Sequence, residues 1–456
     1  MRALARSVVV GVALLVAANC ASDQEQPPRA ILLVTLDTTR ADRLTPYGYM
    51  SASMPTFDRL AGEGVVFDQA ISVAPLTLPA HASLLTGLLP PSHGLRDNNA
   101  PPLAPEHTTM AESLKARGFR TAAFVGASVL ASDRGLNQGF DYYGEDIGGS
   151  LSELQAHQRR ASAVVDEALD WLGRTDNESI FMWVHLYDPH RPYSPPEPFA
   201  SRYAHDPYLG EIAYMDAEIG RLIDVLDQTH PNRSLVVVAG DHGESLGEHG
   251  ERDHGIFVYD NVLRVPLIIR TASRQPRRVG SVVRLTDVMP TVLAVAGIVA
   301  PKTDGVNLVD VMRGQTLDLD SYSESYYPKQ FGWSPLRVLR GDRFKLIDAP
   351  RPELYDLQQD PFETTNVYGE RPALVRAMQQ RLSVVSGLAS MAMHASEVTV
   401  DHRVRERLAA LGYTMRGAGQ PDGSPGSAPD PKDCIDTIDE QSPTRPIAHK
   451  RPTAGC

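Results

Sequence analysis

Acidic and histidine side chains stand directly after several apolar runs of this sequence. Asp37 follows ILLVTL, Asp188 and His190 follow IFMWVHLY, and Asp241 and His242 follow LVVVAG. If these runs are parallel strands, their carboxyl ends meet at one edge of the sheet, where ligands bind in open α/β folds. Each Asp taken alone has a simpler interpretation as a helix cap or turn residue. Taken together, the five residues predict a ligand or metal site at that edge.

Thr77 allows two interpretations. It stands just before the helical pattern Ala80–Leu88, with Pro79 in the first turn, as an N-cap residue would. The same position would place its hydroxyl in the positive field of a helix N-terminus, which favours an alkoxide and an anionic substrate. A bound dication would lower the hydroxyl pKa further and make Thr77 a nucleophile. His81 is four residues on and shares the helix face of Thr77.

The stretch Asp241–Gly255 reads DHGESLGEHGERDHG. It contains three histidines, His242, His249 and His254, among several carboxylates and glycines, a composition unsuited to core packing. Mixed oxygen and nitrogen ligands suit zinc or manganese better than calcium. The alternative is a solvated polar loop.

Apolar runs alternate with helical patterns over about 300 residues, which predicts an α/β core with a largely parallel sheet. The expected strands are Ile31–Leu36, Thr121–Val125, Ile180–Tyr187, Leu235–Ala239 and Pro266–Ile269. The expected helices are Met54–Gly64, Thr109–Gly118, Ala161–Leu172 and Glu211–Leu226. Continuous β-branched runs of this kind are typical of strands buried on both faces.

The pattern changes after about residue 320, which predicts a smaller antiparallel subdomain over residues 321–413. Arg337–Leu339 and Phe344–Ile347 flank RGDR as a hairpin would, and a helix is expected at Pro372–Ser386. Residues 416–456 are rich in Gly, Pro, Ser and Asp, and we expect this tail to be mostly disordered. Cys434 and Cys456 could pair in an oxidising compartment.

Composition excludes several classes of protein. The 456 residues carry 44 Lys and Arg against 56 Asp and Glu, a net charge of −12. A protein that coats nucleic acid needs a basic surface, so nucleic acid is not an expected partner. The three cysteines, Cys20, Cys434 and Cys456, exclude a CxxC zinc site and a dense disulfide framework.

The N-terminus, Met1–Ala21, predicts a secretory signal peptide. Arg2 and Arg6 precede the apolar run VVVGVALLVAA and a set of small residues. The run is too short for a comfortable membrane span, and the alternative is a buried N-terminal helix. Cys20 stands where a bacterial lipoprotein carries its lipidated Cys, although Asn19 precedes it. We expect export to the periplasm or the bacterial cell surface, with membrane contact only through such a lipid anchor.

Several motifs, in order along the chain, resemble the sulfatase family of the alkaline-phosphatase superfamily. The resemblance covers about Ile31 to Tyr413 and rests on DTTRAD at Asp37–Asp42, PLTLPAHASLLTG at Pro75–Gly87, DPHRPY at Asp188–Tyr193, Asp241–Gly250, RVPLII at Arg264–Ile269, DVMPT at Asp287–Thr291 and ELYDLQQDPFETTN at Glu353–Asn366. It implies an α/β catalytic domain over residues 28–320. Its sheet would be large, mixed and mostly parallel, sandwiched by helices, with a small C-terminal antiparallel α+β subdomain.

Four positions depart from the sulfatase pattern. Sulfatases carry Cys or Ser at the position of Thr77 and oxidise it to formylglycine, an aldehyde that Thr cannot give. The family's Arg four residues later is His81, the second Asp of its calcium pair is Thr38, and its Asp-Asn pair is Asp241-His242. A Thr nucleophile with an Asp-His pair looks like the phosphodiesterase and phosphoethanolamine-transferase branch of the superfamily.

The resemblance assigns roles to the candidate residues. Asp37, Thr77, Asp241 and His242 would form a first metal site. A second metal site or a grip on the substrate would come from His190 and His254, with Asp188 or His249 as further candidates. The expected cofactor is one or two divalent ions, zinc or manganese rather than calcium. The expected catalytic residues are Thr77, His190, His254 and His81.

The expected function is a metal-dependent hydrolase that cleaves a phosphate ester, mono- or diester, or a sulfate ester, with phosphate preferred. Three alternatives remain open at this point: a phosphoethanolamine-type transferase, a sulfate-ester hydrolase that works without formylglycine, and an inactive protein that binds an anionic ligand. The expected partner is an ester of a small molecule, a glycan or a lipid headgroup.

Overall fold

The computed structural model describes residues 26–146, 158–175, 178–392, 428–435, 438–439 and 442–446. The predicted signal peptide at Met1–Ala21, with Cys20, and Cys456 lie outside these residues. Within the described ranges, none of the helices has the length and apolar character needed to cross a membrane.

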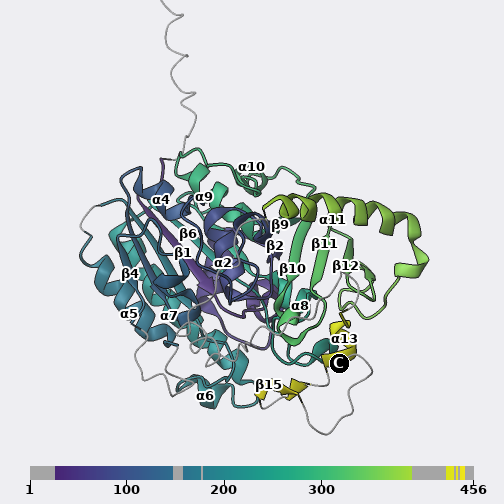
Figure 1. Ribbon diagram of the computed structural model, residues 1–456. Coiled ribbons are helices and arrows are strands. Elements are labelled where there is room, and N and C mark those ends of the chain that lie inside the picture. The colour runs from purple at the N-terminus through teal and green to yellow at the C-terminus, as the bar shows by residue number, and fades with distance from the viewer. Residues whose placement is uncertain are drawn as a thin grey trace, which may run out of the picture.

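A large mixed sheet forms the centre of the molecule (Figure 1). In the described part of the chain its strands follow the order β4-β3-β5-β1-β6-β8-β2-β7, with β9 paired to β2. Their bounds are β1 Ala30–Leu36, β2 Val65–Ile71, β3 Arg120–Val125, β4 Tyr142–Gly144, β5 Ile180–Leu186, β6 Ser234–Gly240, β7 Arg264–Val265, β8 Leu267–Arg270 and β9 Arg277–Arg284. All five predicted strands are confirmed. The fifth, β8, runs antiparallel to β6 and β2, so the sheet is mixed although mostly parallel.

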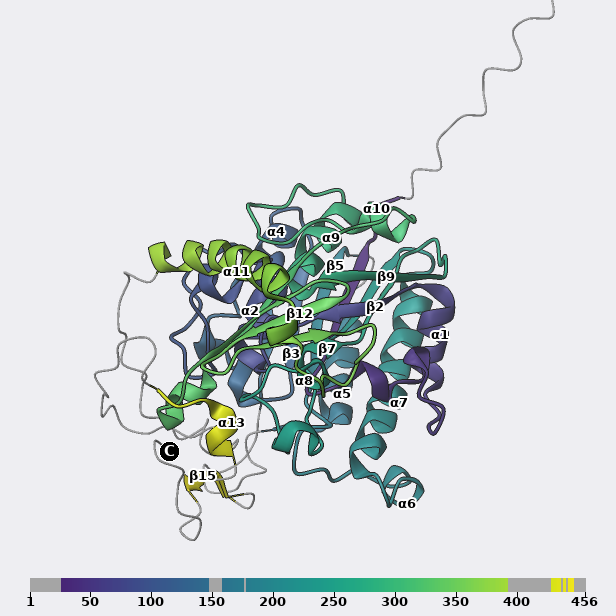
Figure 2. The same ribbon diagram turned by 90° about the vertical axis from the view of Figure 1, so that its right-hand side faces the viewer.

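Helices cover both faces of this sheet. Their bounds are α1 Pro55–Glu63, α2 Thr77–Thr86, α3 Pro90–His93, α4 Met110–Lys115, α5 Ala161–Leu172, α6 Phe199–Arg202, α7 Pro207–Thr229, α8 Asp260–Leu263, α9 Val288–Val295 and α10 Val309–Met312. Figure 2 shows α1 and α7 on one side of the sheet and α2 and α4 on the other. The four helices predicted from the sequence are therefore present as α1, α4, α5 and α7.

Alternate residues of β1 explain why its sequence is a continuous apolar run. Ile31 and Leu33 pack in the core that also holds α2, α4 and α9, whereas Leu32 and Val34 pack in the core that holds α1, α5 and α7. A strand with helices on both faces has no solvent side, so polar residues are rare within it and stand near its carboxyl end, as Thr35 does in β1. The chemistry is therefore confined to the strand ends.

Strands β2, β4, β7 and β9 of the main sheet were not predicted, because they are short or contain polar residues. Asp68 and Gln69 interrupt β2, where the strand is only half-buried. Arg277, Arg278 and Arg284 lie in β9, which pairs with β2 and exposes part of its length. The short strand β4 at Tyr142–Gly144 offers too little sequence to show a pattern.

A second, four-stranded antiparallel sheet begins at Ser321. Its strands are β10 Ser321–Ser325, β11 Leu336–Arg340, β12 Phe344–Asp348 and β13 Glu353–Asp356. The predicted hairpin is present as β11 and β12. The predicted helix is present as α11, Pro372–Ala392, which lies across this sheet (Figure 1) and packs Val375, Met378 and Leu382 against it.

Within the tail predicted to be mostly disordered, residues 428–435 are described and contact the second sheet. Helix α13, Pro431–Cys434, is short but buries Pro431 and Cys434, and Cys434 is disulfide-bonded. Asp430 accepts a hydrogen bond from the backbone N–H of Arg351 at 2.9 Å, and Lys432 pairs with the buried Glu353. These specific contacts outweigh the Gly- and Pro-rich composition that favoured disorder. Strands β14 (Ile438–Asp439) and β15 (Ser442–Pro446) follow.

Candidate active site

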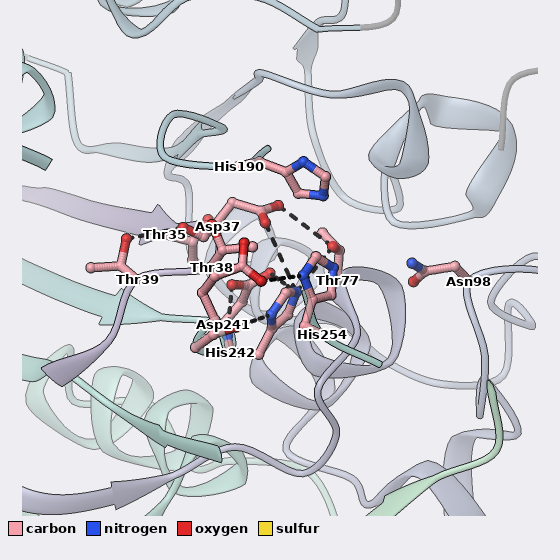
Figure 3. A network of polar contacts seen from close by, with 12 residues as sticks. Thr35, Asp37, Thr38, Thr39, Thr77, Asn98, His190, Asp241, His242 and His254 are labelled. Atoms are coloured by element: carbon pink, nitrogen blue, oxygen red, sulfur yellow. Dashed lines mark hydrogen bonds and ion pairs between the residues drawn. The ribbon is translucent and has the colours of Figure 1, made fainter. Parts of the chain in front are cut away.

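The sheet register brings the strand ends together. In β1, Leu36 lies beside Leu186 of β5 and beside Gly240 of β6. Asp37 and Asp241 therefore leave the sheet at the same level, as the sequence predicts. Asp37, Asp241 and His242 all have buried side chains, and Figure 3 shows them converging below His190.

Thr77 lies at the first position of α2, one residue further into the helix than an N-cap. The N-cap is Leu76, and its side chain makes no capping hydrogen bond. The interpretation of Thr77 as a simple helix cap is therefore wrong. Its buried hydroxyl instead lies 3.3 Å from His242 Nε2 and 3.5 Å from Asp37 Oδ2 (Figure 3). The hydroxyl is at a helix N-terminus and at the centre of the acidic and histidine cluster.

Asp37, Asp241 and His242 have the donor geometry of a metal site. One donor atom from each lies within 4.8 Å of the others. Asp37 Oδ1 and Asp241 Oδ2 are buried and make no hydrogen bond among the described residues. His242 directs Nδ1 to the carbonyl oxygen of Gly243 at 3.0 Å, which leaves the lone pair of Nε2 for the cluster. Two unsatisfied carboxylate oxygens and an imidazole lone pair fit a divalent cation.

The electrostatics of the cluster agree with this. Burial raises the pKa of Asp37. Burial, followed by the charge of Asp37, raises the pKa of Asp241 well above its usual value. Burial also lowers the pKa of His242 well below its usual value. Two buried carboxylates that repel each other beside a neutral imidazole are an environment that a dication stabilises.

Two further buried histidines, His185 and His81, hydrogen-bond to residues of this cluster. His185 lies within β5, receives the backbone N–H of Gly126 at Nδ1, and so donates Nε2–H to Asp37 Oδ2 at 3.2 Å. His81 donates Nδ1–H to the carbonyl of Thr77 at 2.8 Å, and its Nε2 accepts from the hydroxyl of Thr35 at 2.9 Å. Burial lowers the pKa of both histidines to about 3. Both ring nitrogens of His81 are thus engaged, so this geometry suits the orientation of Thr77 better than proton transfer.

His190 and His254 lie beside the cluster, with ring centroids 5.1 Å apart. His190 directs Nδ1 to the carbonyl of Arg191 at 2.8 Å, and its Nε2 is buried without a hydrogen-bond partner among the described residues. His254 lies 4.4 Å from His242 between ring centroids. Its Nδ1 lies 2.9 Å from Asp253 Oδ1 and 3.2 Å from Glu244 Oε1. Both histidines thus use Nδ1 to hold their orientation.

The acidic partners of His254 have shifted pKa values. Burial raises the pKa of Glu244 to about 7, an effect that the charge of Asp253 adds to and that His254 opposes. Burial would also raise the pKa of Asp253, but the attraction to His254 lowers it to about 2. At neutral pH His254 therefore faces at least one ionised carboxylate.

The two further candidates, Asp188 and His249, lie outside the cluster. Asp188 accepts the backbone N–H of Ala161 at 2.8 Å, the first residue of α5. His249 stacks on Tyr259, with ring centroids 3.6 Å apart, and lines a large cavity of about 1120 Å³ between the main sheet and the second sheet. Among the described residues, neither Asp188 nor His249 belongs to a set of side chains whose donor atoms could bind one metal ion.

Thr38 replaces an expected acidic ligand with a strained backbone. Its φ of 47° lies in the left-handed region, which is unfavourable for a β-branched residue. Tyr208 holds this conformation by donating its hydroxyl hydrogen to the carbonyl of Thr38 at 2.7 Å. The strain is therefore retained immediately next to Asp37.

Three residues near the cluster were missed by sequence reasoning. His185 is hidden inside an apolar strand, and Glu244 is one of many carboxylates in its loop. Asn98 is fully buried, and its Oδ1 accepts the N–H of Leu78 at 2.9 Å. This fixes its Nδ2, which has no hydrogen-bond partner among the described residues and faces Thr77 in Figure 3. The position of Asn98 offers an uncharged donor to an anionic group bound at Thr77.

Two family models match the chain. The model described as Sulfatase matches residues 29–298, and the model described as N-sulphoglucosamine sulphohydrolase, C-terminal, matches residues 247–386. The uncharacterized sulfatase YidJ of Escherichia coli is 27% identical over 418 residues, covering 74% of this chain and 82% of its own. Choline-sulfatase of Rhizobium meliloti is also 27% identical, covering 69% and 77%.

Solved structures share the fold. The phosphonate monoester hydrolase of Agrobacterium radiobacter superposes with a TM-score of 0.67 at 22% identity, covering 80% of this chain and 96% of its own. A protein solved with its substrate D-glucosamine-2-N,6-O-disulfate superposes with a TM-score of 0.68 at 22% identity, covering 82% and 100%. The fold predicted from the resemblance, alkaline-phosphatase-like with a small second sheet, is thereby confirmed.

Proposed function

The chain belongs to the sulfatase family and is a hydrolase acting on ester bonds, and on that premise we propose that it cleaves a singly charged ester, a phosphate diester first, with Thr77 as the nucleophile. The observation that carries this proposal is the position of the Thr77 hydroxyl, 3.3 Å from His242 Nε2 and 3.5 Å from Asp37 Oδ2. The oxygen is buried, oriented and surrounded by groups that accept its proton.

Thr77 has to act as an alcohol. Because Thr cannot be oxidised to formylglycine, the hydrated aldehyde that the resemblance implies for sulfatases is not available here. In the first step Thr77 Oγ1 forms a bond to phosphorus while the bond from phosphorus to the leaving oxygen breaks. In the second step water attacks the same phosphorus and releases Thr77.

The donor set of Asp37, Asp241 and His242 fits a divalent ion, as the family typically uses. Bound there, a dication would lower the pKa of the Thr77 hydroxyl and neutralise charge on the transferred group. We propose zinc or manganese rather than calcium, because an imidazole nitrogen is among the ligands and Thr38 takes the place of the second Asp. A second ion would have to use His190 or His254.

The charge of the site supports a singly charged group. In the described part of the chain no Lys or Arg side chain hydrogen-bonds to Asp37, Thr77, Asp241 or His242. Asn98 is instead an uncharged donor. A phosphate diester or a sulfate ester carries one negative charge, whereas a phosphate monoester carries nearly two at neutral pH and would need more positive charge.

His254 and His190, the two outer histidines, can each carry out one of the two proton transfers. The carboxylates at Nδ1 of His254 orient its ring, so that a proton on Nε2 can pass to the leaving oxygen. His190 has only a carbonyl partner at Nδ1, and a neutral His190 presents the lone pair of Nε2. It is therefore suited to accept a proton from the attacking water or to bind a second ion.

A sulfate ester is the second candidate substrate, and the comparisons favour it. Several relatives are named as sulfatases, among them an N-acetylglucosamine-6-O-sulfatase of Bacteroides thetaiotaomicron that is 24% identical. For this chain, we propose that such a substrate would be cleaved by Thr77 without formylglycine. If an acceptor alcohol replaced water in the second step, the same site would act as a transferase.

Purified protein should be assayed with 4-nitrophenyl esters after reconstitution with zinc, manganese or calcium. We expect turnover of bis(4-nitrophenyl) phosphate and of a phenylphosphonate monoester to exceed that of the phosphate monoester and of the sulfate, and to be abolished by a chelator. Sulfate turnover above that of the diester would favour the second candidate. No turnover and no bound metal would indicate an inactive protein that binds an anionic ligand.

We also propose that the protein is exported, on the sequence of Met1–Ala21 alone. The mass of the N-terminal peptide from the cell envelope tests this. A peptide beginning at a lipidated Cys20 would indicate an anchored form, and an intact Met1 would contradict export.

A further inference from the structure

Glu244 connects the two loops that carry the outer histidines. It lies two residues after His242 and is fully buried. One of its oxygens, Oε1, lies 3.2 Å from His254 Nδ1, and the other, Oε2, accepts the hydroxyl hydrogen of Tyr193 at 3.1 Å. Tyr193 follows His190 in the DPHRPY loop. A single carboxylate thus contacts His254 and the loop of His190.

We propose that Glu244 is a positioning residue that sets the orientation of His254 and keeps it in register with His190. The inference rests on the proposed function, in which His254 protonates the leaving oxygen. With Nδ1–H held by Glu244, only Nε2 of His254 can face the ester. When Nε2 gives its proton to the leaving oxygen, the neutral ring that remains keeps its Nδ1–H on Glu244.

Asp253 is the rival partner, because its Oδ1 lies 2.9 Å from the same nitrogen. Its side chain is 42% exposed, however, whereas that of Glu244 is completely enclosed. An exposed carboxylate supplies charge but is free to change rotamer. Glu244 also accepts a hydrogen bond from Tyr193 in the His190 loop, and Arg191 of that loop donates to the carbonyl of Arg252 at 2.7 Å, so Glu244 shares in fixing the spacing of 5.1 Å between the two histidine rings.

The network continues beneath Glu244. Arg40 donates Nη1–H to the backbone carbonyl of Glu244 at 3.2 Å and pairs with Glu248 at 2.7 Å. The backbone N–H of Arg40 in turn donates to the hydroxyl of Tyr208 at 3.1 Å, and that hydroxyl holds the strained Thr38. Glu244 is therefore anchored through both its backbone and its side chain, which is what a residue that orients another requires.

The test is a series of aryl methyl phosphates whose leaving phenols increase in pKa, with the same aryl groups as sulfates if only sulfates turn over. A good leaving group needs little protonation and a poor one needs much. In Glu244→Gln we expect kcat/KM to fall about 3-fold for the 4-nitrophenyl ester and about 30-fold or more for the unsubstituted phenyl ester. Glu244→Asp should recover most of the loss for the phenyl ester, because it keeps the charge.

Glu251→Gln is the matched control. Glu251 is a buried glutamate of the same loop, but its oxygens accept the backbone N–H groups of Ile256 and Phe257 at 2.9 and 3.2 Å. We expect it to lower the melting temperature without changing the dependence on the leaving group. An equal loss across the series in Glu244→Gln, or the same slope in Glu251→Gln, would overturn the positioning role.

A second measurement separates this inference from the proposed function. In protein labelled with ¹⁵N-histidine, we expect a downfield, slowly exchanging Nδ1–H resonance, assigned by its loss in His254→Gln. It should move upfield or exchange rapidly in Glu244→Gln and stay unchanged in Glu251→Gln. If the wild type hydrolyses none of the esters, the proposed function fails, and this resonance alone decides the role of Glu244. An unchanged resonance in Glu244→Gln would refute it.

Discussion

Two clusters of buried charge differ in how their charges are balanced. At the end of the main sheet, Asp37 and Asp241 lie side by side with oxygens that have no hydrogen-bond partner among the described residues. Between the two sheets, Asp260 of α8 is also buried, but Lys345 of β12 approaches it to 2.8 Å and Arg340 of β11 to 3.0 Å. We call this second group the inter-sheet cluster; Glu363 completes it, 2.7 Å from Lys345.

The difference separates function from stability. Burying a carboxylate is costly unless a positive charge compensates it. In the inter-sheet cluster the chain supplies the positive charges, and the result is a fixed contact between two parts of the fold. At the sheet end, no Lys or Arg of the described residues hydrogen-bonds to the two carboxylates, and the groups beside them that can carry positive charge are histidines, so a bound cation would complete the compensation. An unbalanced buried cluster is therefore the better indicator of a reactive site.

The largest effect is expected from Thr77→Ala, which removes the nucleophile and leaves the charges untouched. We expect kcat/KM to fall about 10³-fold or more, while the melting temperature changes by no more than about 1 °C. Thr86→Ala is the control, since Thr86 lies in the same helix and its hydroxyl bonds to the backbone of Ala82 and Leu88, away from the cluster. Near-normal turnover in Thr77→Ala would mean that Thr77 is not the nucleophile.

Asp260→Ala breaks the balanced cluster instead. Removing the carboxylate leaves Arg340 without its acidic partner and Lys345 with Glu363 alone, so we expect a loss of about 3–5 kcal/mol in the free energy of unfolding at pH 7. The folded fraction should keep the kcat/KM of the wild type. Urea unfolding and assays at the same temperature measure both. Lost activity without lost stability would reverse the assignment of the two clusters.

The inter-sheet cluster also predicts the direction in which the stability of the protein changes with pH. Burial would raise the pKa of Asp260, but Arg340 and Lys345 lower it below its usual value. A carboxyl with a lowered pKa in the folded state stabilises the protein above the pKa of the unfolded state, and this contribution is lost as the pH falls through the folded-state value. The stability difference between the wild type and Asp260→Ala should therefore shrink as the pH falls below about 4.

A smaller effect is expected from His185→Phe, which removes the hydrogen bond to Asp37 Oδ2 but keeps a ring in the strand. Loss of such a support typically weakens metal affinity by about 10- to 100-fold, measured by competition with a chelating dye. His93→Phe is the control, because His93 is equally buried but bonds to Ser83. Equal affinity losses in both variants would indicate a general packing effect.

The smallest effect is expected from Asp241→Asn, which should stabilise the metal-free protein. In metal-free protein, Asp241→Asn removes one of two carboxylates that repel each other, so we expect it to raise the free energy of unfolding by about 1 kcal/mol. With zinc added, the order should reverse, because the wild type gains binding energy that the variant lacks. Thermal melts with chelator and with zinc provide the test. A lower melting temperature in both would mean that the carboxylates do not repel.

The sequence allowed the main elements and the central residues of the cluster to be predicted. Strands with helices on both faces stand out as apolar runs, so Asp37, Asp241 and His242 at their ends were conspicuous. His185 was not, because a histidine inside an apolar run looks like any buried residue. Strands β2 and β9 were missed because polar residues interrupt them. Such failures occur where tertiary neighbours, rather than local pattern, determine the environment of a residue.

The sequence alone could not decide where Thr77 lies relative to the start of its helix. A pattern of helix-forming residues cannot place a helix start to within one residue, and that single residue decides whether the hydroxyl caps the helix or faces the cluster. The ordered segment 428–435 shows the opposite limit. Composition describes a segment on its own, but Lys432 and Asp430 become ordered through contacts with Glu353 and Arg351, which lie far away in the chain.

That segment also bears on how the protein is made. Glu353 lies within the second sheet, where it accepts a hydrogen bond from the hydroxyl of Tyr259 at 3.0 Å, and its cationic partner Lys432 lies 79 residues later in the chain. Because domains fold progressively as the nascent chain emerges from the ribosome, the catalytic sheet can form while this partner is still inside the exit tunnel. The ion pair of Glu353 with Lys432 would then form only after Lys432 has left the exit tunnel.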